Sequence, residues 1–183
     1  MEVIQTGISG LIVIQPAIFN DNRGYFYESY SAQRYYNIGL PTFIQDNVSR
    51  SSYGVVRGLH YQLAPYSQSK LVQVLKGKVL DVAVDLRKES PTFGHHHAVE
   101  LSDENHLQFF IPQGFAHGFS VLSEEVIFSY KCDQFYNKNA ERGLAFNDPA
   151  LAIDWKIAPQ DMIISHKDST LPIMKEADIN FYY

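Results

Sequence analysis

Four residues with the chemistry of proton transfer lie in separate short segments of the chain. They are His60, Lys70, His117 and Asp168. A carboxylate beside a histidine fixes the tautomer of the ring and stabilises the imidazolium, which makes the histidine a good general base. A lysine or a second histidine can stabilise a developing oxyanion, and a tyrosine such as Tyr130 can act as an acid. The residue types therefore indicate acid–base chemistry, although spacing alone does not show that these segments meet.

Each of these residues also has a purely structural interpretation. A lone histidine such as His60 is more often a hydrogen-bonded structural residue than a base. Arg57, three positions before it, can simply pair with a carboxylate. Tyr130 fits a strand tyrosine whose ring is packed and whose hydroxyl reaches the rim, and residues 165–168 fit a turn. The residues by themselves leave both interpretations open.

The segments that must position these residues are short, β-rich and separated by turn residues. Only Ala32–Tyr36 and the region after Pro159 fit short helices. Many short strands at fairly even spacing predict an all-β sandwich or barrel. The expected strands are Leu11–Ile14, Tyr25–Tyr30, Val55-Val56, Leu71–Leu75, Val79–Leu86, Ala98–Leu101, Leu107–Ile111, Phe119–Leu122 and Val126–Tyr130.

Length and composition fit one globular domain over residues 1–183, with 45% hydrophobic and 19% charged residues. The net charge of −5 argues against a general nucleic-acid surface. No apolar stretch approaches the ~18–20 residues of a membrane span, and the first residues lack the pattern of a signal peptide. Cys132 is the only cysteine, which excludes an internal disulfide and a four-thiolate zinc site. We expect a cytoplasmic protein that binds neither nucleic acid nor membrane.

Further motifs stand in order along nearly the whole chain, from about Ile4 to Asp168. They are Phe19–Glu28, Gln45–Asn47, Ser49–Ser52, Arg57–Gln62, Lys70–Val72, Asp81–Arg87, Ser90–Gly94, Ile111–Phe119, Tyr130-Lys131, Asn147–Pro149, Ile153–Trp155 and Ser165–Asp168. As a series they resemble the dTDP-4-dehydrorhamnose 3,5-epimerase family, the nucleotide-sugar epimerases of the rhamnose pathway. The resemblance implies a cupin-type jelly-roll barrel with a few short helices. It also implies a homodimer that works without a metal or organic cofactor.

The resemblance further implies a substrate and a set of catalytic roles. The substrate would be a dTDP-4-keto-6-deoxyhexose, dTDP-4-dehydro-6-deoxy-D-glucose, converted to dTDP-4-dehydro-L-rhamnose. Its C4 ketone acidifies the hydrogens on C3 and C5, so a base can remove each one. In the matching positions His60 is the base and Asp168 its partner. Lys70 would stabilise the enolate oxygen, and Tyr130 would deliver the proton on the other face.

The binding residues follow from the same resemblance. Arginine's planar fork suits phosphate oxygens. Arg23, Arg57, Gln45 and Asn47 are expected to hold the diphosphate and the nucleotide, with Phe19 and Phe26 flanking the nucleotide. Glu28 and His117 are expected near the substrate, and Tyr136 is expected to line the pocket. The match at Tyr136 is weaker, because its neighbour Phe135 stands where many relatives carry a second tyrosine.

The run His95-His96-His97 is a departure from the family pattern and introduces a metal-binding cupin as an alternative. Alternation along a strand places His95 and His97 on one face, which allows adventitious metal binding. A solvated strand edge is the simpler interpretation. Metal cupins pair two histidines separated by one residue with a nearby glutamate, and no second ligand follows His60. We therefore expect no metal in the central pocket.

Two other functions use the same scaffold. One is a non-catalytic domain that binds sugar nucleotides, since a fold does not fix a function. The other is a relative that epimerises a single centre or shifts the ketone between C3 and C4. The presence of His60, Asp168, Lys70 and Tyr130 together favours the 3,5-epimerase.

Overall fold

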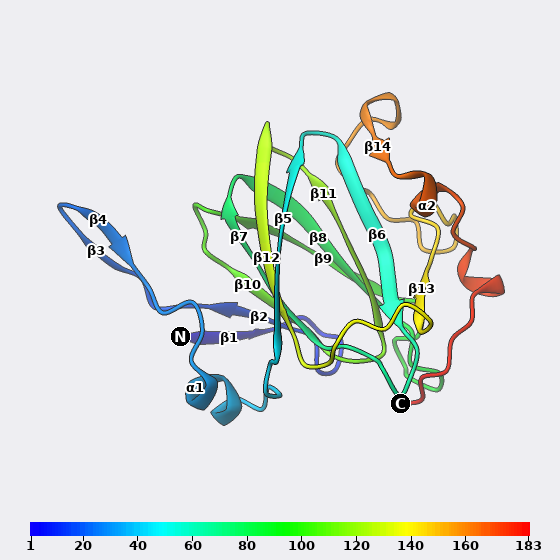
Figure 1. The fold of residues 1–183 in the computed structure, drawn as a ribbon, viewed down its shortest axis with the longest axis horizontal. Helices are drawn as coiled ribbons and strands as arrows, with labels where there is room; N and C mark the ends of the chain where they lie inside the picture. Colours follow the sequence, from blue (N-terminus) through cyan, green and yellow to red (C-terminus); the bar gives the residue numbers. More distant parts are fainter.

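Two β-sheets form the body of the protein, whose computed structural model describes residues 1–183 (Figure 1). The first sheet has the strand order β1 (Glu2–Gln5), β2 (Ile12–Gln15), β10 (Gln108–Ile111), β7 (Lys70–Lys76), β12 (Glu125–Cys132) and β5 (Gln45–Ser52). The second has the order β13 (Glu141–Gly143), β6 (Val55–Gln62), β11 (Phe115–Val121), β8 (Lys78–Asp85) and β9 (His96–Ser102), and β14 (Ile163–Ile164) pairs with β6. The other elements are the hairpin β3 (Phe19–Asp21) and β4 (Gly24–Phe26), the helices α1 (Ala32–Asn37) and α2 (His166–Ser169), and the 3₁₀ turns Pro159–Asp161 and Met174–Glu176.

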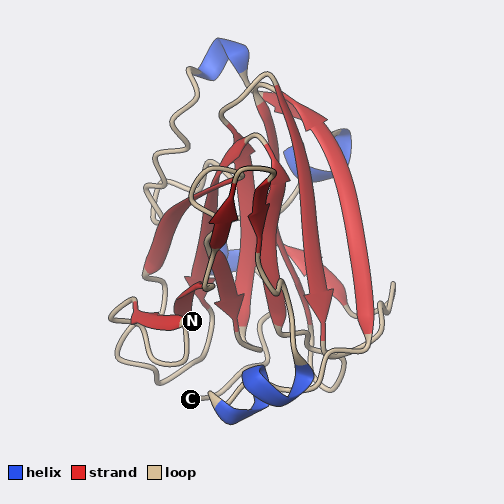
Figure 2. Cartoon of the chain, turned by 90° about the vertical axis from the view of Figure 1, so that its left-hand side faces the viewer, coloured by secondary structure: helices blue, strands red, loops and turns tan.

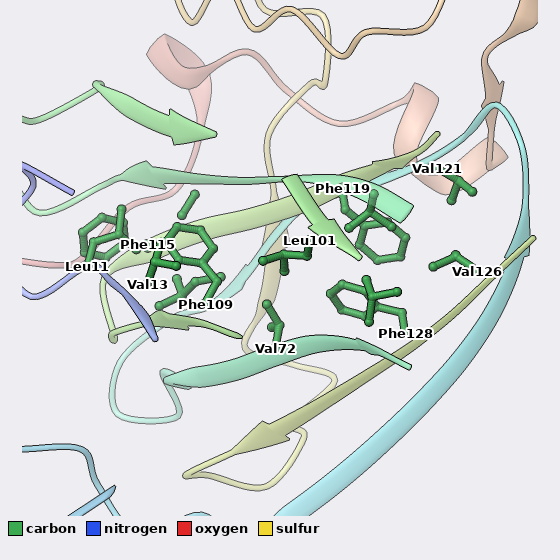
Figure 3. Packing of buried hydrophobic residues seen from close by; sticks show 14 of the residues in the cluster. Leu11, Val13, Val72, Leu101, Phe109, Phe115, Phe119, Val121, Val126 and Phe128 are labelled. Atoms are coloured by element: carbon green, nitrogen blue, oxygen red, sulfur yellow. The ribbon is translucent and has the colours of Figure 1, made fainter. Parts of the chain in front are cut away.

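The main core lies between the two sheets, because alternate residues of each strand point inward. Phe119 of β11 and Phe128 of β12 stack across the gap with their ring centroids 4.3 Å apart (Figure 3). Burying each such ring contributes about 1.5–3 kcal/mol. Strands make up most of the ordered structure, and the helices are short pieces at the periphery (Figure 2). The predicted all-β jelly roll is confirmed.

The outer face of the second sheet is also covered, by the C-terminal part of the chain. Ile179 and Phe181 are buried there in a cluster that includes Trp155. The chain end is held by Arg87, whose guanidinium lies over the rings of Phe115 and Tyr183 at 4.6 and 5.0 Å. The segment from Met174 to Tyr183 therefore docks on its own chain.

The predicted strands omit β1, β3, β5, β13 and β14, and one predicted strand is shorter than expected. The strand expected over Tyr25–Tyr30 ends at Phe26, and the hairpin β3–β4 that contains it projects away from the body (Figure 1). The strand β5 was missed because its sequence from Gln45 to Ser52 is almost entirely polar. Its inward residues line a cavity instead of an apolar core, so the apolar alternation that marks a half-buried strand is absent.

None of the helices has the length and apolar character that crossing a lipid bilayer requires.

Candidate active site

A bulge in β6 turns His60 toward the interior of the barrel. Val55 packs on the inner core, whereas Leu59 packs on the outer one. The register of β6 against β11 shifts by one residue between Arg57 and His60, so that His60 lies opposite His117. Gly58 occupies the bulge with φ of +117°, and a Cβ there would lie 2.6 Å from the Cα of Gly118. Simple alternation would place Arg57 and His60 on opposite faces, but the bulge brings both to one cavity.

His60 forms a hydrogen-bonded pair with Asp168. The Nε2 atom of His60 lies 2.7 Å from Oδ1 of Asp168. Asp168 is buried at the start of α2, where its backbone N–H donates to Oγ of Ser165 and its Oδ2 accepts from the N–H of Gly58. Burial by itself raises the pKa of Asp168, but the hydrogen bond and charge of His60, the N–H of Gly58 and the charge of Lys167 together hold that pKa below its ordinary value. The carboxylate is thus charged and ready to stabilise a protonated His60.

A second pair of this kind lies deeper in the barrel. The Nε2 atom of His117 is 2.9 and 3.0 Å from the two carboxylate oxygens of Asp81 on the neighbouring strand β8. Burial lowers the pKa of His117, although Asp81 opposes this effect. With Nε2–H donated to Asp81, the Nδ1 atom is an acceptor that makes no hydrogen bond within the chain. His117 therefore presents a neutral acceptor to the cavity that it lines.

Lys70 and Tyr130 lie on the first sheet and face the two histidines. The Nζ atom of Lys70 is 6.0 Å from the ring centroid of Tyr130. Burial lowers the pKa of Lys70, which Cys132, Asp81 and Glu141 partly offset, and burial raises the pKa of Tyr130. Lys70 has no ion-pair partner in the chain. Its charge is available to a negative group that enters the cavity.

Two adjoining cavities meet at these residues, since His60, Lys70 and Tyr130 line both. The charged cavity, of about 500 Å³, is also lined by Arg57, His117, Lys167 and Asp168. The amide cavity, of about 340 Å³, is also lined by Gln45, Asn47, Gln62, Gln68, Tyr136 and Glu141. The structure thus brings together the predicted catalytic residues and five of the nine predicted binding residues.

Arg57 lies at the mouth of the charged cavity. Arg57 is exposed, and its guanidinium donates to Oγ of Ser51 from Nε and Nη2 at 3.1 and 3.0 Å. This contact holds the side chain over the opening while leaving other N–H groups free for a ligand.

The remaining four predicted binding residues do not reach the cavities of their own chain. Phe19, Arg23 and Phe26 lie on the projecting hairpin, where the Arg23 side chain is 85% exposed and pairs with Asp21. Glu28 follows the hairpin and forms an ion pair with Arg34 at 3.4 Å. None of the four lines either cavity.

The sequence interpretation overlooked Glu141, Lys167 and Asp81 as site residues. Glu141 accepts from the Tyr136 hydroxyl at 3.0 Å and from Nζ of Lys167 at 2.7 Å, at the rim where the two cavities meet. Only Asp81 had a signal in the sequence, as a carboxylate inside the apolar run of β8. A charged residue in such a run needs a buried partner.

The histidine run lies away from both cavities. His96 and His97 begin β9 at the edge of the second sheet, as a strand-edge interpretation requires, but the ring of His97 packs 5.8 Å from that of Phe109. The structure has no cluster of three or more His, Cys, Asp or Glu side chains suited to hold a metal ion.

Taken together, the cavity offers a base, a cation and an acid around one space. The His60–Asp168 pair approaches from the second sheet, and Lys70 and Tyr130 approach from the first. Such a site can remove a proton beside a carbonyl group, stabilise the resulting oxyanion and return a proton from another direction.

Known proteins resemble the chain along its whole length. The family model described as dTDP-4-dehydrorhamnose 3,5-epimerase matches residues 5–176. A dTDP-4-dehydrorhamnose 3,5-epimerase of Shigella flexneri is 49% identical over 170 residues, which cover 92% of this chain and 93% of that protein.

Solved structures of similar proteins have the same fold. The dTDP-4-dehydrorhamnose 3,5-epimerase from Elizabethkingia anophelis NUHP1 has a TM-score of 0.92 and 53% identity, over 96% of this chain and 97% of that one. A dTDP-6-deoxy-D-glucose-3,5-epimerase from Legionella pneumophila Philadelphia 1, in complex with dTDP-4-keto-L-rhamnose, has a TM-score of 0.95 and 48% identity, over 100% and 98% of the two chains.

Proposed function

The chain belongs to the dTDP-4-dehydrorhamnose 3,5-epimerase family, and on this premise we propose that His60, Asp168, Lys70 and Tyr130 are its catalytic residues. The protein is an isomerase that inverts C3 and C5 of dTDP-4-dehydro-6-deoxy-D-glucose and yields dTDP-4-dehydro-L-rhamnose. One observation carries the residue assignment: the His60–Asp168 pair faces Lys70 and Tyr130 across a single cavity.

The proposed chemistry moves only protons. His60 removes the hydrogen on C3 or C5, and the electron pair of the broken C–H bond moves onto the C4 oxygen as an enolate. The Lys70 ammonium stabilises this oxyanion, and its low-dielectric surroundings strengthen the interaction. Tyr130 donates a proton to the opposite face of the carbon, which inverts the centre. Asp168 stabilises the imidazolium while His60 carries the proton.

The substrate-binding residues have separate tasks in this proposal. Arg57 at the mouth of the charged cavity suits the diphosphate. His117 offers its Nδ1 acceptor to a sugar hydroxyl, and Asn47 contributes an amide on β5. Tyr136, a residue that is 55% exposed beside the amide cavity, offers the face of its ring to the nucleotide base for stacking.

We further propose that the protein is a homodimer in which the β3–β4 hairpin serves the partner's site. Arg23 and the exposed rings of Phe19 and Phe26 lie on an arm that its own chain does not cover. Apolar rings displayed in this way need a covering surface. Tyr25 and Tyr27 pack on His106 at 4.5 and 5.1 Å, which fixes the base of the arm and its direction.

A mixed dimer tests whether the arm acts on the partner. One chain carries Arg23→Ala and the other His60→Ala, with different affinity tags so that the mixed species can be purified. If the arm serves the partner, one of the two sites has both residues and the mixed dimer recovers about half of the wild-type activity. If the arm serves its own chain, the mixed dimer stays at or below the level of the Arg23→Ala homodimer.

The overall function is tested by proton NMR with dTDP-4-keto-6-deoxyglucose in D₂O, with the product trapped by a downstream reductase. We expect deuterium at both C3 and C5. Exchange at one centre only would indicate a single-centre epimerase, and binding without any exchange would indicate a non-catalytic sugar-nucleotide protein. Localisation in the reducing cytoplasm, where the free thiol of Cys132 is stable, completes the proposal.

A further inference from the structure

Glutamine side chains hold the backbone of the loop from Gln134 to Asn137, which we call the platform loop. It joins β12 to β13 at the rim of the amide cavity. Gln68 donates to the carbonyl oxygen of Gln134 at 2.7 Å. Gln45 accepts from the N–H of Tyr136 at 3.2 Å. Polar tethers of this kind replace the strand ladder that a loop lacks.

Gln62 supplies the other two hydrogen bonds to the platform loop and is the central glutamine of the three. Its Nε2 donates to the carbonyl oxygen of Phe135 at 3.3 Å, and its Oε1 accepts from the N–H of Asn137 at 2.7 Å. Nε2 also donates to the carbonyl oxygen of Tyr66 at 2.6 Å. Gln62 is 4% exposed, at the end of β6 and two residues after His60. Each of the four platform-loop residues thus has a peptide group bonded to a glutamine.

Two hydrogen bonds hold Tyr136, one at its backbone and one at its hydroxyl. Gln45 holds its backbone N–H, and Glu141 accepts from its hydroxyl at 3.0 Å. Tyr136 as a whole nevertheless stays 55% exposed beside the cavity. An aromatic ring held in its binding orientation before the ligand arrives costs little entropy when a base stacks on it.

We propose that Gln62 is a positioning residue for nucleotide binding, which acts by holding the platform loop so that Tyr136 faces the base. The inference rests on the nucleotide-binding role given to Tyr136 above. The side-chain amide of Gln62 is hydrogen-bonded to three backbone groups, so Gln62 affects the ligand through the loop. An unsatisfied peptide group in the platform loop would allow it to move away from the cavity.

Binding of dTDP, measured by titration calorimetry, provides the test, because it does not depend on turnover. Gln62→Met keeps the size of the side chain and removes all three bonds. We expect the Kd for dTDP to rise about tenfold, within the range that loss of base stacking produces. The KM for the sugar nucleotide should rise in parallel, with kcat at saturation nearly unchanged.

A double-mutant cycle with Tyr136→Ala separates positioning from direct contact. If Gln62 acts through Tyr136, Gln62→Met has almost no further effect on Kd in the Tyr136→Ala protein. An equal tenfold effect in both backgrounds would overturn the proposal, and so would an unchanged Kd in the single variant. Should Gln62→Met fail to fold, Gln68→Ala removes one tether of the same loop at a half-buried position. It should weaken dTDP binding by about two- to threefold with the same dependence on Tyr136.

Gln108→Met is the matched control. Gln108 is a fully buried glutamine on β10 that donates to the carbonyl oxygen of Ser29 and to Gln73 and accepts from the Tyr35 hydroxyl. It lines neither cavity, so its replacement should lower the thermal stability and leave the Kd for dTDP unchanged. Wild-type exchange in D₂O, run in parallel, keeps the two proposals apart: dTDP binding without epimerisation would refute the proposed function and leave the role of Gln62 testable.

Discussion

Replacing His60 with alanine is expected to lower epimerisation by about 10²–10⁴-fold, the usual contribution of a positioned general base. Asp168 bonds the His60 ring at 2.7 Å, whereas burial lowers the pKa of His117, the other histidine that lines the cavity, so His117 is a poor substitute as base. Loss of the base should remove both product formation and the exchange of the C3 and C5 hydrogens with D₂O. Both are measured by proton NMR with the sugar nucleotide.

Two controls define the meaning of that result. The Kd of the His60→Ala protein for dTDP and its circular dichroism spectrum should match the wild type, because the proposed mechanism uses the His60 ring at the sugar carbons. His95→Ala changes an exposed histidine outside both cavities and should keep full activity. Substantial epimerisation by the His60→Ala protein would remove His60 from the role of base.

Replacing Lys70 with methionine is expected to lower kcat by about 10²–10³-fold, as loss of an oxyanion-stabilising group does. The enolate would then form without the buried Lys70 ammonium beside it, which raises the barrier to proton removal at both centres. Lys76→Met is the matched control, since Lys76 lies at the other end of β7 and pairs with Glu125 at the surface. A Lys70→Met protein that keeps kcat within about threefold would show that the enolate charge is stabilised elsewhere.

Lys70 should also set the alkaline side of the pH–rate profile. Burial lowers its pKa below the ordinary 10.5, so the ammonium loses its proton, and the rate falls, at a lower pH than for an exposed lysine. Burial raises the pKa of Tyr130, so this acid stays protonated as Lys70 titrates. In Lys70→Arg the charge persists to above about pH 12, and the alkaline decline should move to higher pH. An unchanged decline in kcat would contradict the assignment.

The sequence predicted much of the fold because the strands of a two-sheet core alternate. Runs such as Leu71–Leu75 and Val126–Tyr130 have one apolar face, and both are strands of the first sheet. The prediction failed where an inward face is polar. In β5 the inward residues Gln45 and Asn47 line a cavity, and nothing in an isolated polar segment distinguishes such a strand from a loop.

The sequence by itself also determined the chemistry available to the protein: the residue types and, with Cys132 as the single cysteine, the absence of any internal disulfide. The tertiary structure decided which of those groups face one another. His60 points inward only because the bulge at Gly58 shifts the register of β6 against β11 by one residue. Asp168 reaches it across 108 residues of sequence only because the C-terminal segment docks on the second sheet. The face to which a strand residue points depends on its register against the neighbouring strands, and the docking of a distant segment depends on the folded sheet. The spacing of residues within one segment predicts neither.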